Sequence, residues 1–266
     1  MPTEDRAEPS NCQTISATVI ALNEADNLTR CLKSLDFADE IILVDSGSTD
    51  ETLEIARKFN VKIYSEVWRG YGAQKNFAMS HAACDWVLNV DADEEITVEL
   101  KKEILAAISS PNSFDGYAIA RKTFFLGKWI RHGGWFPNYV MRLCKRKAGS
   151  WTEPEVHEVL KISGTVGRFN EPMNHFTFKN LNDQILTNVK YARNGARQFI
   201  LSRPNVGLIS LVTLALAKPI GKFIETYFFK LGVLDGLRGF IISVNAAYSV
   251  FMKYVFALEE KFLGPI

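Results

Sequence analysis

Apolar residues form four short runs along the first 110 positions, separated by segments in which they recur at helical spacing. The runs are continuous and rich in β-branched residues, which is typical of strands buried on both faces of a sheet. They cover residues 15–22, 40–44, 61–64 and 86–90. Helices are predicted over residues 25–35, from the cap at Ser48 to about Phe59 and from the cap at Thr97 to about Ser109, and residues 70–83 are predicted to form a loop that enters a helix. This alternation predicts an α/β fold with a mostly parallel sheet flanked by helices.

Two of the predicted helices carry capping signals at their starts. Ser48 is followed three residues later by Glu51, a pattern typical of a capping box, and it predicts a helix that runs to about Phe59. Thr97 is placed to cap the next helix, which is predicted to end near Ser109.

The pattern changes after about residue 116. Strands are predicted over residues 117–122 and 139–145, and the chain is predicted to be helical from Leu181 onward. The segment 208–217 is strongly apolar, but Lys218-Pro219 is predicted to end its helix. That segment is shorter than the roughly 20 residues that cross a membrane.

The C-terminal region combines apolar helices with an excess of cations. Between Val206 and Leu258 there are five Lys or Arg against two acids, a local balance of +3. This composition predicts helices that lie in a membrane interface and face anionic lipid. The alternatives are a helical lid packed on the core and a dimer face. The predicted organisation is a flexible polar tail at 1–14, an α/β domain at 15–178 and a helical region at 179–266.

Composition limits the classes of protein to consider. The chain has 266 residues, of which 47% are hydrophobic and 23% charged, as expected of a folded, core-forming protein. The net charge of +1 gives no support to nucleic-acid binding. The four cysteines are widely spaced and form no CxxC pair, which indicates a reducing compartment. The first fourteen residues lack the basic start and apolar centre of a signal peptide.

The most informative stretch is WVLNVDADEE, residues 86–95. In extended backbone, residues two apart project from the same face, so Asp91 and Asp93 are expected to point together. Two carboxylates aimed at one spot repel each other unless a cation lies between them, and their oxygens suit Mg²⁺ or Mn²⁺. Such an ion commonly completes its shell with substrate phosphates and water. The simpler interpretation is a solvated acidic turn.

Other polar residues also follow predicted strands. Asn23 and Glu24 come after the first strand and Asp45 after the second. Ligands of such sheets bind outside the carboxyl ends of the strands, so these side chains and Asp91 are expected at one edge. No GxGxxG follows the first strand and no GxxxxGK[ST] occurs in the chain, so a dinucleotide fingerprint and a Walker loop are both excluded.

Five motifs, in this order, resemble those of the family 2 glycosyltransferases, which adopt the Rossmann-like GT-A fold. They are VIALNEADNL (19–28), DEIILVDSGSTDET (39–52), GAQKNFAM (72–79), DWVLNVDADEE (85–95) and VHE (156–158). Within the family the chain is most similar to the lipopolysaccharide inner-core transferases that add glucose to a heptose, whose tails resemble residues 222–251. The resemblance implies transfer of a hexose, with glucose expected, from a UDP-sugar to a lipid-linked or lipopolysaccharide-core acceptor.

The resemblance also implies roles for individual residues. Asp93 is the nearer ligand of the metal, Mg²⁺ or Mn²⁺, and Asp91 contacts the ribose or the metal. Asp45 matches the position that hydrogen-bonds the uracil ring, and Lys75 is placed to meet the diphosphate unless it is a solvated helix cation. The residues implied to bind the nucleotide sugar are Ala21, Asn23, Glu24, Asp45, Gln74, Lys75 and Asp91. Arg142 is a further candidate for the diphosphate.

Similar members of the family invert the anomeric carbon, and a single in-line displacement needs one general base. Glu158, beside His157, is the predicted base. If residues 156–159 are extended, the two side chains point to opposite faces, so one would face the metal or diphosphate and the other the acceptor. His157 is therefore also a candidate metal ligand. Glu153 and Glu155 stay as alternatives for the base.

These expectations place the protein as a peripheral enzyme on the cytoplasmic face of the bacterial inner membrane, with its oligomeric state left open. Three alternatives compete. A nucleotidyltransferase would carry a basic glycine-rich loop after the first strand, where this chain has ALNEADN (21–27). A non-catalytic, membrane-associated sugar-nucleotide binder would be favoured by loss of Asp93 or of the VHE motif. A family member acting on polyprenyl phosphate would share all the motifs above.

Overall fold

The computed structural model describes residues 13–153 and 158–263, and the chain divides into two compact units. The first unit contains the chain up to Ala120 together with Tyr139–Met173. The second contains Arg121–Asn138 and the chain from Asn174 onward. Each unit has its own apolar core.

The four predicted parallel strands are present and form one half of the main sheet. They are β1 (Ile15–Ala21), β2 (Glu40–Asp45), β3 (Lys62–Ser65) and β4 (Trp86–Asp91). The sheet has the order β3-β2-β1-β4-β8-β6, followed by β12 and β5, where β5 is Glu94–Glu95, β6 is Gly116–Phe125, β8 is Asn138–Lys145 and β12 is Met173–His175. The first four strands pair in parallel, and β8 (Asn138–Lys145) pairs with β4 in antiparallel orientation. The prediction of a mostly parallel half-sheet is therefore confirmed, with an antiparallel extension.

Both faces of the parallel strands are covered by helices. Along β2, Ile41 and Leu43 enter the apolar cluster that also contains residues of α1 (Ala25–Ser34), α2 (Thr52–Ala56) and α4 (Val98–Ile108). Ile42 and Val44 enter the cluster that contains residues of α3 (Tyr71–Ser80). Successive residues of a strand point to opposite faces, so a continuous apolar run is required where both faces are buried.

The remaining strands are short or lie in the second half of the sheet. They are β5 (Glu94–Glu95), β6 (Gly116–Phe125), β7 (Lys128–Trp129), β9 (Gly149–Trp151), β10 (Leu160–Ile162), β11 (Val166–Arg168) and β12 (Met173–His175).

One of the two predicted helix caps is confirmed and the other is wrong. Thr97 Oγ1 accepts a hydrogen bond from the backbone N–H of Leu100, as expected for the cap of α4. The Ser48–Glu51 capping box does not form, because α2 begins only at Thr52 and Ser48 Oγ accepts instead from the N–H of Asn23. A contact across the sheet edge has taken the place of the local one.

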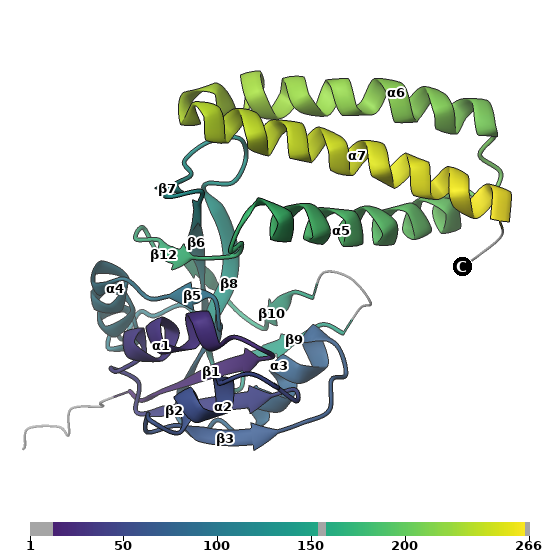
Figure 1. Cartoon of the computed structure of the whole chain (residues 1–266). Helices are drawn as coiled ribbons and strands as arrows, with labels where there is room; N and C mark the ends of the chain where they lie inside the picture. Colours follow the sequence, from purple (N-terminus) through teal and green to yellow (C-terminus); the bar gives the residue numbers. More distant parts are fainter. Residues whose placement is uncertain (1–12, 154–157, 264–266) are drawn as a thin grey trace, which may run out of the picture. The chain divides into compact units, whose positions relative to one another are not determined.

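The C-terminal part of the second unit is helical, as predicted. It consists of α5 (Leu181–Ser202), α6 (Leu208–Ile224), a π-helical turn η1 (Glu225–Phe229), a 3₁₀ turn η2 (Gly232–Asp235) and α7 (Leu237–Leu263). α7 runs beside both α5 and α6 (Figure 1). The expectation that Lys218-Pro219 ends the helix is wrong, since Pro219 lies inside α6. Packing against α7 offsets the cost of a proline in the helix interior, about 3 kcal/mol.

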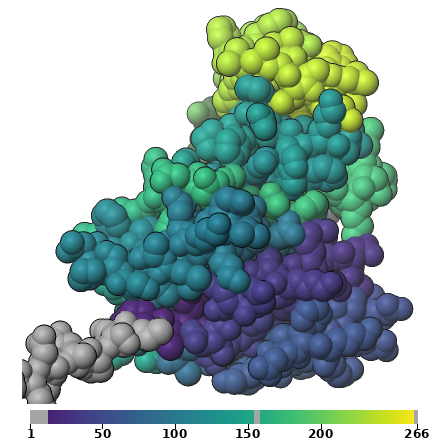
Figure 2. Space-filling model, turned by 90° about the vertical axis from the view of Figure 1, so that its left-hand side faces the viewer, coloured from purple at the N-terminus to yellow at the C-terminus, as the bar shows by residue number. Residues whose placement is uncertain are grey.

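The helices of the second unit leave large apolar side chains uncovered. Phe229 of η1 is 80% exposed and Ile209 of α6 is 85% exposed. Within the described residues, α7 is the one helix whose length and apolar composition would suffice to cross a membrane, and 28% of its most apolar window is buried in the structure. The yellow-green atoms of this region are shown in Figure 2.

Candidate active site

The carboxyl ends of three parallel strands bring the predicted site residues of the first unit to one edge of the sheet. In the register of β1 with β2, Ala21 lies opposite Asp45, and in that of β1 with β4, Ile20 lies opposite Asp91. Asp45 and Asp91, which are 46 positions apart in the sequence, therefore end the two strands that flank β1. This is the edge at which ligands bind in open α/β sheets.

Two loops at this edge are tied together by hydrogen bonds through Asn23 and Glu24. The N–H of Asn23 donates to Ser48 Oγ at 2.9 Å, and its side-chain oxygen accepts from the N–H of Thr49 at 2.8 Å. The N–H of Glu24 donates to Thr52 Oγ1 at 2.8 Å. Asn23 has φ of 58°, a left-handed conformation that asparagine adopts more readily than most residues. These bonds fix the loop after β1 against the loop after β2.

Asp45 is buried, with 2% of its surface exposed, and only one of its carboxylate oxygens is satisfied within the described residues. Asp45 Oδ2 accepts from the N–H groups of Gly47 and Ser48 at 2.9 and 3.0 Å. Asp45 Oδ1 has no hydrogen-bond partner there. A buried acceptor without a donor is costly, so a ligand that brings an N–H group would be favoured at this position.

Gln74 on α3 likewise has a buried oxygen atom without a hydrogen-bond partner among the described residues. Its side chain is fully buried, and its Nε2 donates to Ser46 Oγ and to the carbonyl oxygen of Glu66, each at 3.0 Å. Its Oε1 has no partner within the described residues. The two unsatisfied acceptors belong to neighbouring segments, since Gln74 contacts the residue that follows Asp45.

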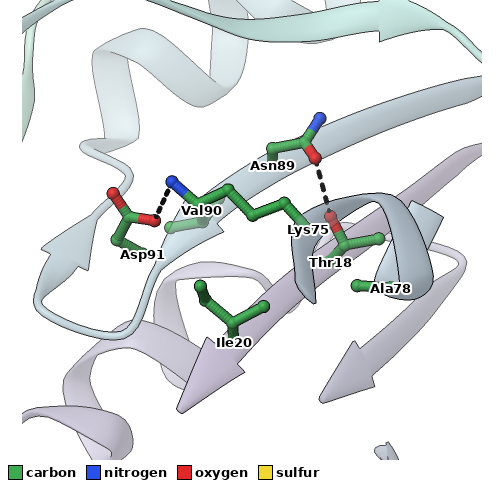
Figure 3. Close-up of a pocket in the computed structure, with 7 residues that line it drawn as sticks. All are labelled: Thr18, Ile20, Lys75, Ala78, Asn89, Val90 and Asp91. Atoms are coloured by element: carbon green, nitrogen blue, oxygen red, sulfur yellow. Dashed lines mark hydrogen bonds and ion pairs between the residues drawn. The ribbon is translucent and has the colours of Figure 1, made fainter. Parts of the chain in front are cut away.

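Lys75 joins the end of β4 to the segment that carries the predicted base. Its Nζ lies 3.0 Å from Asp91 Oδ1 and 3.1 Å from Glu158 Oε1. The same ammonium group lies 4.4 Å from the ring centroid of Trp151, within the range of a cation–π contact. Lys75 and Asp91 also line a narrow hollow with Thr18 and Asn89 (Figure 3). Lys75 is thus buried and paired, and the alternative of a solvated helix cation is wrong.

Arg142 on β8 is the second cation of this cluster. Its Nη2 donates to Asp91 Oδ2 and, at 2.6 Å, to Glu94 Oε1. Glu94 is fully buried, and its other oxygen accepts the N–H of Asp91 at 2.9 Å. The candidate residue Arg142 therefore lies at the site, bound to Asp91. Glu94 was not anticipated; the second pair of acids in DADEE was its signal in the sequence.

The charges in the cluster shift one another's ionisation. Burial alone would raise the pKa of Asp91, but the Arg142 guanidinium and the Lys75 ammonium outweigh it and hold that pKa well below its ordinary range. Burial would lower the pKa of Arg142, and Asp91 and Glu94 outweigh it, so that this pKa is raised. Asp91 is therefore a carboxylate at every pH at which the protein is expected to work.

Asp91 and Asp93 do not lie in one extended strand. β4 ends at Asp91, and Ala92 and Asp93 form a turn before β5. The expectation that they share a face because of strand geometry is therefore wrong. The cations beside Asp91 are Lys75 and Arg142, which accounts for its charge without a metal ion. No group of three His, Cys, Asp or Glu with metal-binding geometry occurs within the described ranges.

The candidates for the general base differ in their surroundings. Glu158 is half-buried and contacts Lys75, whereas Glu153 is exposed and accepts a hydrogen bond from Asn76 Nδ2 at 2.8 Å. The predictions for Glu155 and His157 fall on residues 154–157, outside the described ranges.

A buried polar network behind the cluster was also missed. Asn89 Oδ1 accepts from Trp151 Nε1 at 3.0 Å and from Thr18 Oγ1 at 3.2 Å, and its Nδ2 donates to the carbonyl oxygen of Arg142. The network holds the indole beneath Lys75. Its only signal in the sequence was a polar residue inside an apolar strand.

Comparisons with known proteins agree with this geometry. The family model described as glycosyl transferase family 2 matches residues 16–162, more than half of the chain. The lipopolysaccharide core biosynthesis glycosyltransferase LpsC of Rhizobium meliloti is 30% identical over 250 residues, which are 90% of this chain and 89% of that protein. An uncharacterised glycosyltransferase of Rickettsia conorii is also 30% identical, over 90% of this chain and 88% of its own length.

Among solved structures, the chain is similar to the mannosyltransferase PcManGT of Pyrobaculum calidifontis, solved with GDP-mannose and Mn²⁺. The TM-score is 0.54 at 13% identity, and the match covers all of this chain and 92% of that one. This likeness supports the GT-A-like fold, a mixed sheet with flanking helices and a helical appendage. From the family match, the identity to relatives along nearly their whole length and the fold, we conclude that the chain is a glycosyltransferase that belongs to family 2.

Proposed function

We propose that the protein is an inverting, metal-dependent transferase that moves a hexose, glucose by preference, from a UDP-sugar to a lipopolysaccharide-core acceptor. The observation that carries the proposal is the position of Lys75, whose ammonium group contacts both Asp91 at the end of β4 and Glu158. The end of β4 is a donor-binding edge, and Glu158 is the candidate base. One residue thus connects the two halves of a transfer site.

The unsatisfied acceptors at the edge support a uridine nucleotide as the donor. A uracil ring presents one N–H, and Asp45 Oδ1 is a buried acceptor that lacks a donor among the described residues. Gln74 Oε1 would accept from a hydroxyl group of the ribose or sugar. Asn23, Glu24 and the backbone near Ala21 would line the nucleotide at the ends of the fixed loops.

The residues at the turn after β4 fit a divalent ion held with the donor. We assign Asp93 as its protein ligand and treat Asp91, which is bound to Lys75 and Arg142, as the residue that orients the site. Mg²⁺ and Mn²⁺ accept as few as one or two carboxylates when substrate phosphates complete the shell. When bound, the ion would neutralise the charge that develops on the leaving diphosphate. His157 is a further candidate ligand.

Glu158 would carry out the proton transfer. Its carboxylate takes the proton of the acceptor hydroxyl as that oxygen forms a bond to the anomeric carbon. The bond from the anomeric carbon to the diphosphate breaks, and its electron pair leaves with UDP. Lys75 holds Glu158 in place through the 3.1 Å contact. The same ammonium group lies beside Asp91 at the end of β4, where the donor is proposed to bind, so it would also contact the diphosphate.

The proposed acceptor and location are supported by the relative LpsC, which is named for lipopolysaccharide core biosynthesis. A core acceptor is anchored in a membrane, and the second unit exposes large apolar side chains such as Phe229 and Ile209. We therefore propose peripheral contact with the cytoplasmic face of the inner membrane.

The test is a transfer assay with full-length protein, Mn²⁺ or Mg²⁺, a panel of UDP-sugars, and either a heptose-terminated core acceptor or polyprenyl phosphate. We expect UDP release to depend on the core acceptor, and NMR of the product to show an anomeric configuration opposite to that of the donor. UDP release that requires polyprenyl phosphate would show that the acceptor is not the lipopolysaccharide core. Binding of UDP by calorimetry without transfer to either acceptor would indicate a non-catalytic binder.

A further inference from the structure

The second unit contains a hollow whose lining shares no residue with the candidate active site. It is formed on one side by residues 128–130, which include β7, and on the other by residues 234–238, where η2 leads into α7. Its volume is about 330 Å³, enough for a small polar group. Figure 2 shows the teal segment that contains β7 next to the yellow-green atoms of the C-terminal helices.

The walls of this hollow carry an excess of positive charge. Lys128 and Arg238 line it directly, and Lys122 lies 4.9 Å from the ring centroid of the lining residue Trp129. Arg238 is held in position because its Nε donates to the carbonyl oxygen of Leu126 at 2.7 Å. The position of these cations is therefore set by the hairpin of β6 and β7 and by the first turn of α7.

Asp235, the one acidic residue among the described residues that line the hollow, already accepts hydrogen bonds from neighbouring residues. Its carboxylate accepts the N–H of His132 at 2.8 Å and that of Arg131 at 3.2 Å. It also lies 3.1 Å from His132 Nδ1, and only 9% of its side chain is exposed. The lining cations Lys128 and Arg238 outnumber this one acid, so the hollow keeps a positive balance that would favour an anion.

Exposed apolar residues border the same hollow. Leu234 is 63% exposed and Leu237 is 71% exposed, and both belong to its wall. Trp129 contributes an indole whose orientation is fixed by edge contacts to Phe124 and Phe176. Tryptophan is favoured at membrane–water interfaces, where one part of the ring is apolar and the other is wet.

We propose that the hollow formed by residues 128–130 and 234–238 binds the phosphate headgroup of an anionic membrane lipid, with Leu234 and Leu237 entering the acyl region beside it. Cations alone would suit free phosphate equally well. The exposed leucines next to them favour a phosphate attached to a lipid, since only that ligand offers both kinds of contact. The proposal rests on the proposed membrane contact and extends it to a defined site.

The test is sedimentation of the full-length protein with vesicles of phosphatidylcholine, with or without phosphatidylglycerol, at constant ionic strength and without donor. Each cation near an anionic surface contributes about fivefold to partition. The double variant Lys128→Ala/Arg238→Ala is therefore expected to lose roughly 25-fold in binding to phosphatidylglycerol vesicles. Its binding to pure phosphatidylcholine should not change.

The matched control removes the same charge from exposed positions of α5, as Lys190→Ala/Arg197→Ala. We expect this variant to lose less than about twofold in vesicle binding, because salt screens the attraction between the anionic lipid and charges that do not lie at the membrane surface. The single variant Lys128→Glu replaces an exposed side chain and guards against misfolding of the double variant. UDP binding by each variant, measured by calorimetry, reports on the first unit separately.

Equal losses in the double variant and its control, or no loss in Lys128→Glu, would overturn the headgroup site. Wild-type binding that is the same with and without phosphatidylglycerol would do so as well. Competition by inorganic phosphate at matched ionic strength, with no dependence on vesicles, would show a free-anion site instead. None of these outcomes bears on transfer, because the measurement needs neither donor nor turnover.

Discussion

The Nζ atom of Lys75 lies 3.1 Å from Oε1 of Glu158, a residue 83 positions later in the chain. The same nitrogen is 3.0 Å from Asp91 Oδ1, so the residue proposed as the base is linked to the strand end where the donor is expected. This contact makes Glu158 the candidate whose loss should affect chemistry more than binding.

Glu158→Gln is expected to lower kcat by about 10²–10⁴-fold, the usual loss for a general base, because an amide cannot take the acceptor's proton. Affinity for the UDP-sugar should change little. The measurement is the initial rate of UDP release at saturating donor and acceptor, together with calorimetric titration of UDP. Glu153→Gln is the control, since Glu153 is exposed and contacts Asn76. A fully active Glu158→Gln beside an inactive Glu153→Gln would move the assignment.

Asp45→Asn is expected to weaken UDP binding roughly 10- to 100-fold, since a hydrogen bond to a charged group contributes about 1.5–3 kcal/mol. The amide oxygen can still accept the N–H groups of Gly47 and Ser48, but its NH₂ group would oppose the N–H of the uracil ring. Stability should therefore be almost unchanged. Calorimetry with UDP and a thermal melt check this, and the exposed Asp26→Asn is the control. Unaltered UDP affinity would contradict the uracil assignment.

Asp93→Ala is expected to lose transfer activity, whereas Asp91→Asn is expected to lose stability. Asp93→Ala removes the proposed metal ligand from a turn, so transfer and its dependence on Mn²⁺ should be lost while the melting temperature is kept. Asp91→Asn removes the charge that the half-buried Asp91 presents to the buried cations Lys75 and Arg142, and it is expected to cost roughly 3 kcal/mol of unfolding free energy. A manganese titration of UDP release and urea denaturation separate the two. Full turnover of Asp93→Ala at saturating metal would refute its role.

Glu40 gives a prediction for the dependence of stability on pH. Burial would raise its pKa, but hydrogen bonds from Lys62, Ser16 and the N–H of Ala83 lower it from 4.5 to about 2. Because the folded-state pKa is depressed, the stabilisation is complete above the unfolded-state pKa and is lost as the pH falls from about 4.5 toward 2. Because solvent screens this partly exposed ion pair, Glu40→Gln should cost about 2 kcal/mol at pH 7, less than the full effect of the lowered pKa, and progressively less below pH 4.5.

Urea denaturation at pH 7, 4 and 3 measures this difference between wild type and Glu40→Gln. The exposed Glu54→Gln should follow the wild type at each pH. If the difference in unfolding free energy between wild type and Glu40→Gln stays constant down to pH 3, the lowered pKa of Glu40 is not its source.

The hydrophobic pattern by itself determined the four parallel strands, the helices between them and the position of Asp45 and Asp91 at strand ends. These features are local, because burial on both faces requires a continuous apolar run, and parallel strands necessarily end at one edge. The motifs likewise indicated the glycosyltransferase family from the sequence, and the comparisons confirmed it.

Only the tertiary structure decided which charges meet. The pairing of Arg142 with Asp91 joins residues 51 positions apart, and that of Lys75 with Glu158 joins residues 83 apart. Such contacts depend on the antiparallel placement of β8 against β4 and on how α3 lies on the sheet, which periodicity does not specify. For the same reason the passage of α6 through Pro219 escaped local rules, because α6 packs against α7 and this packing outweighs the local preference of the backbone.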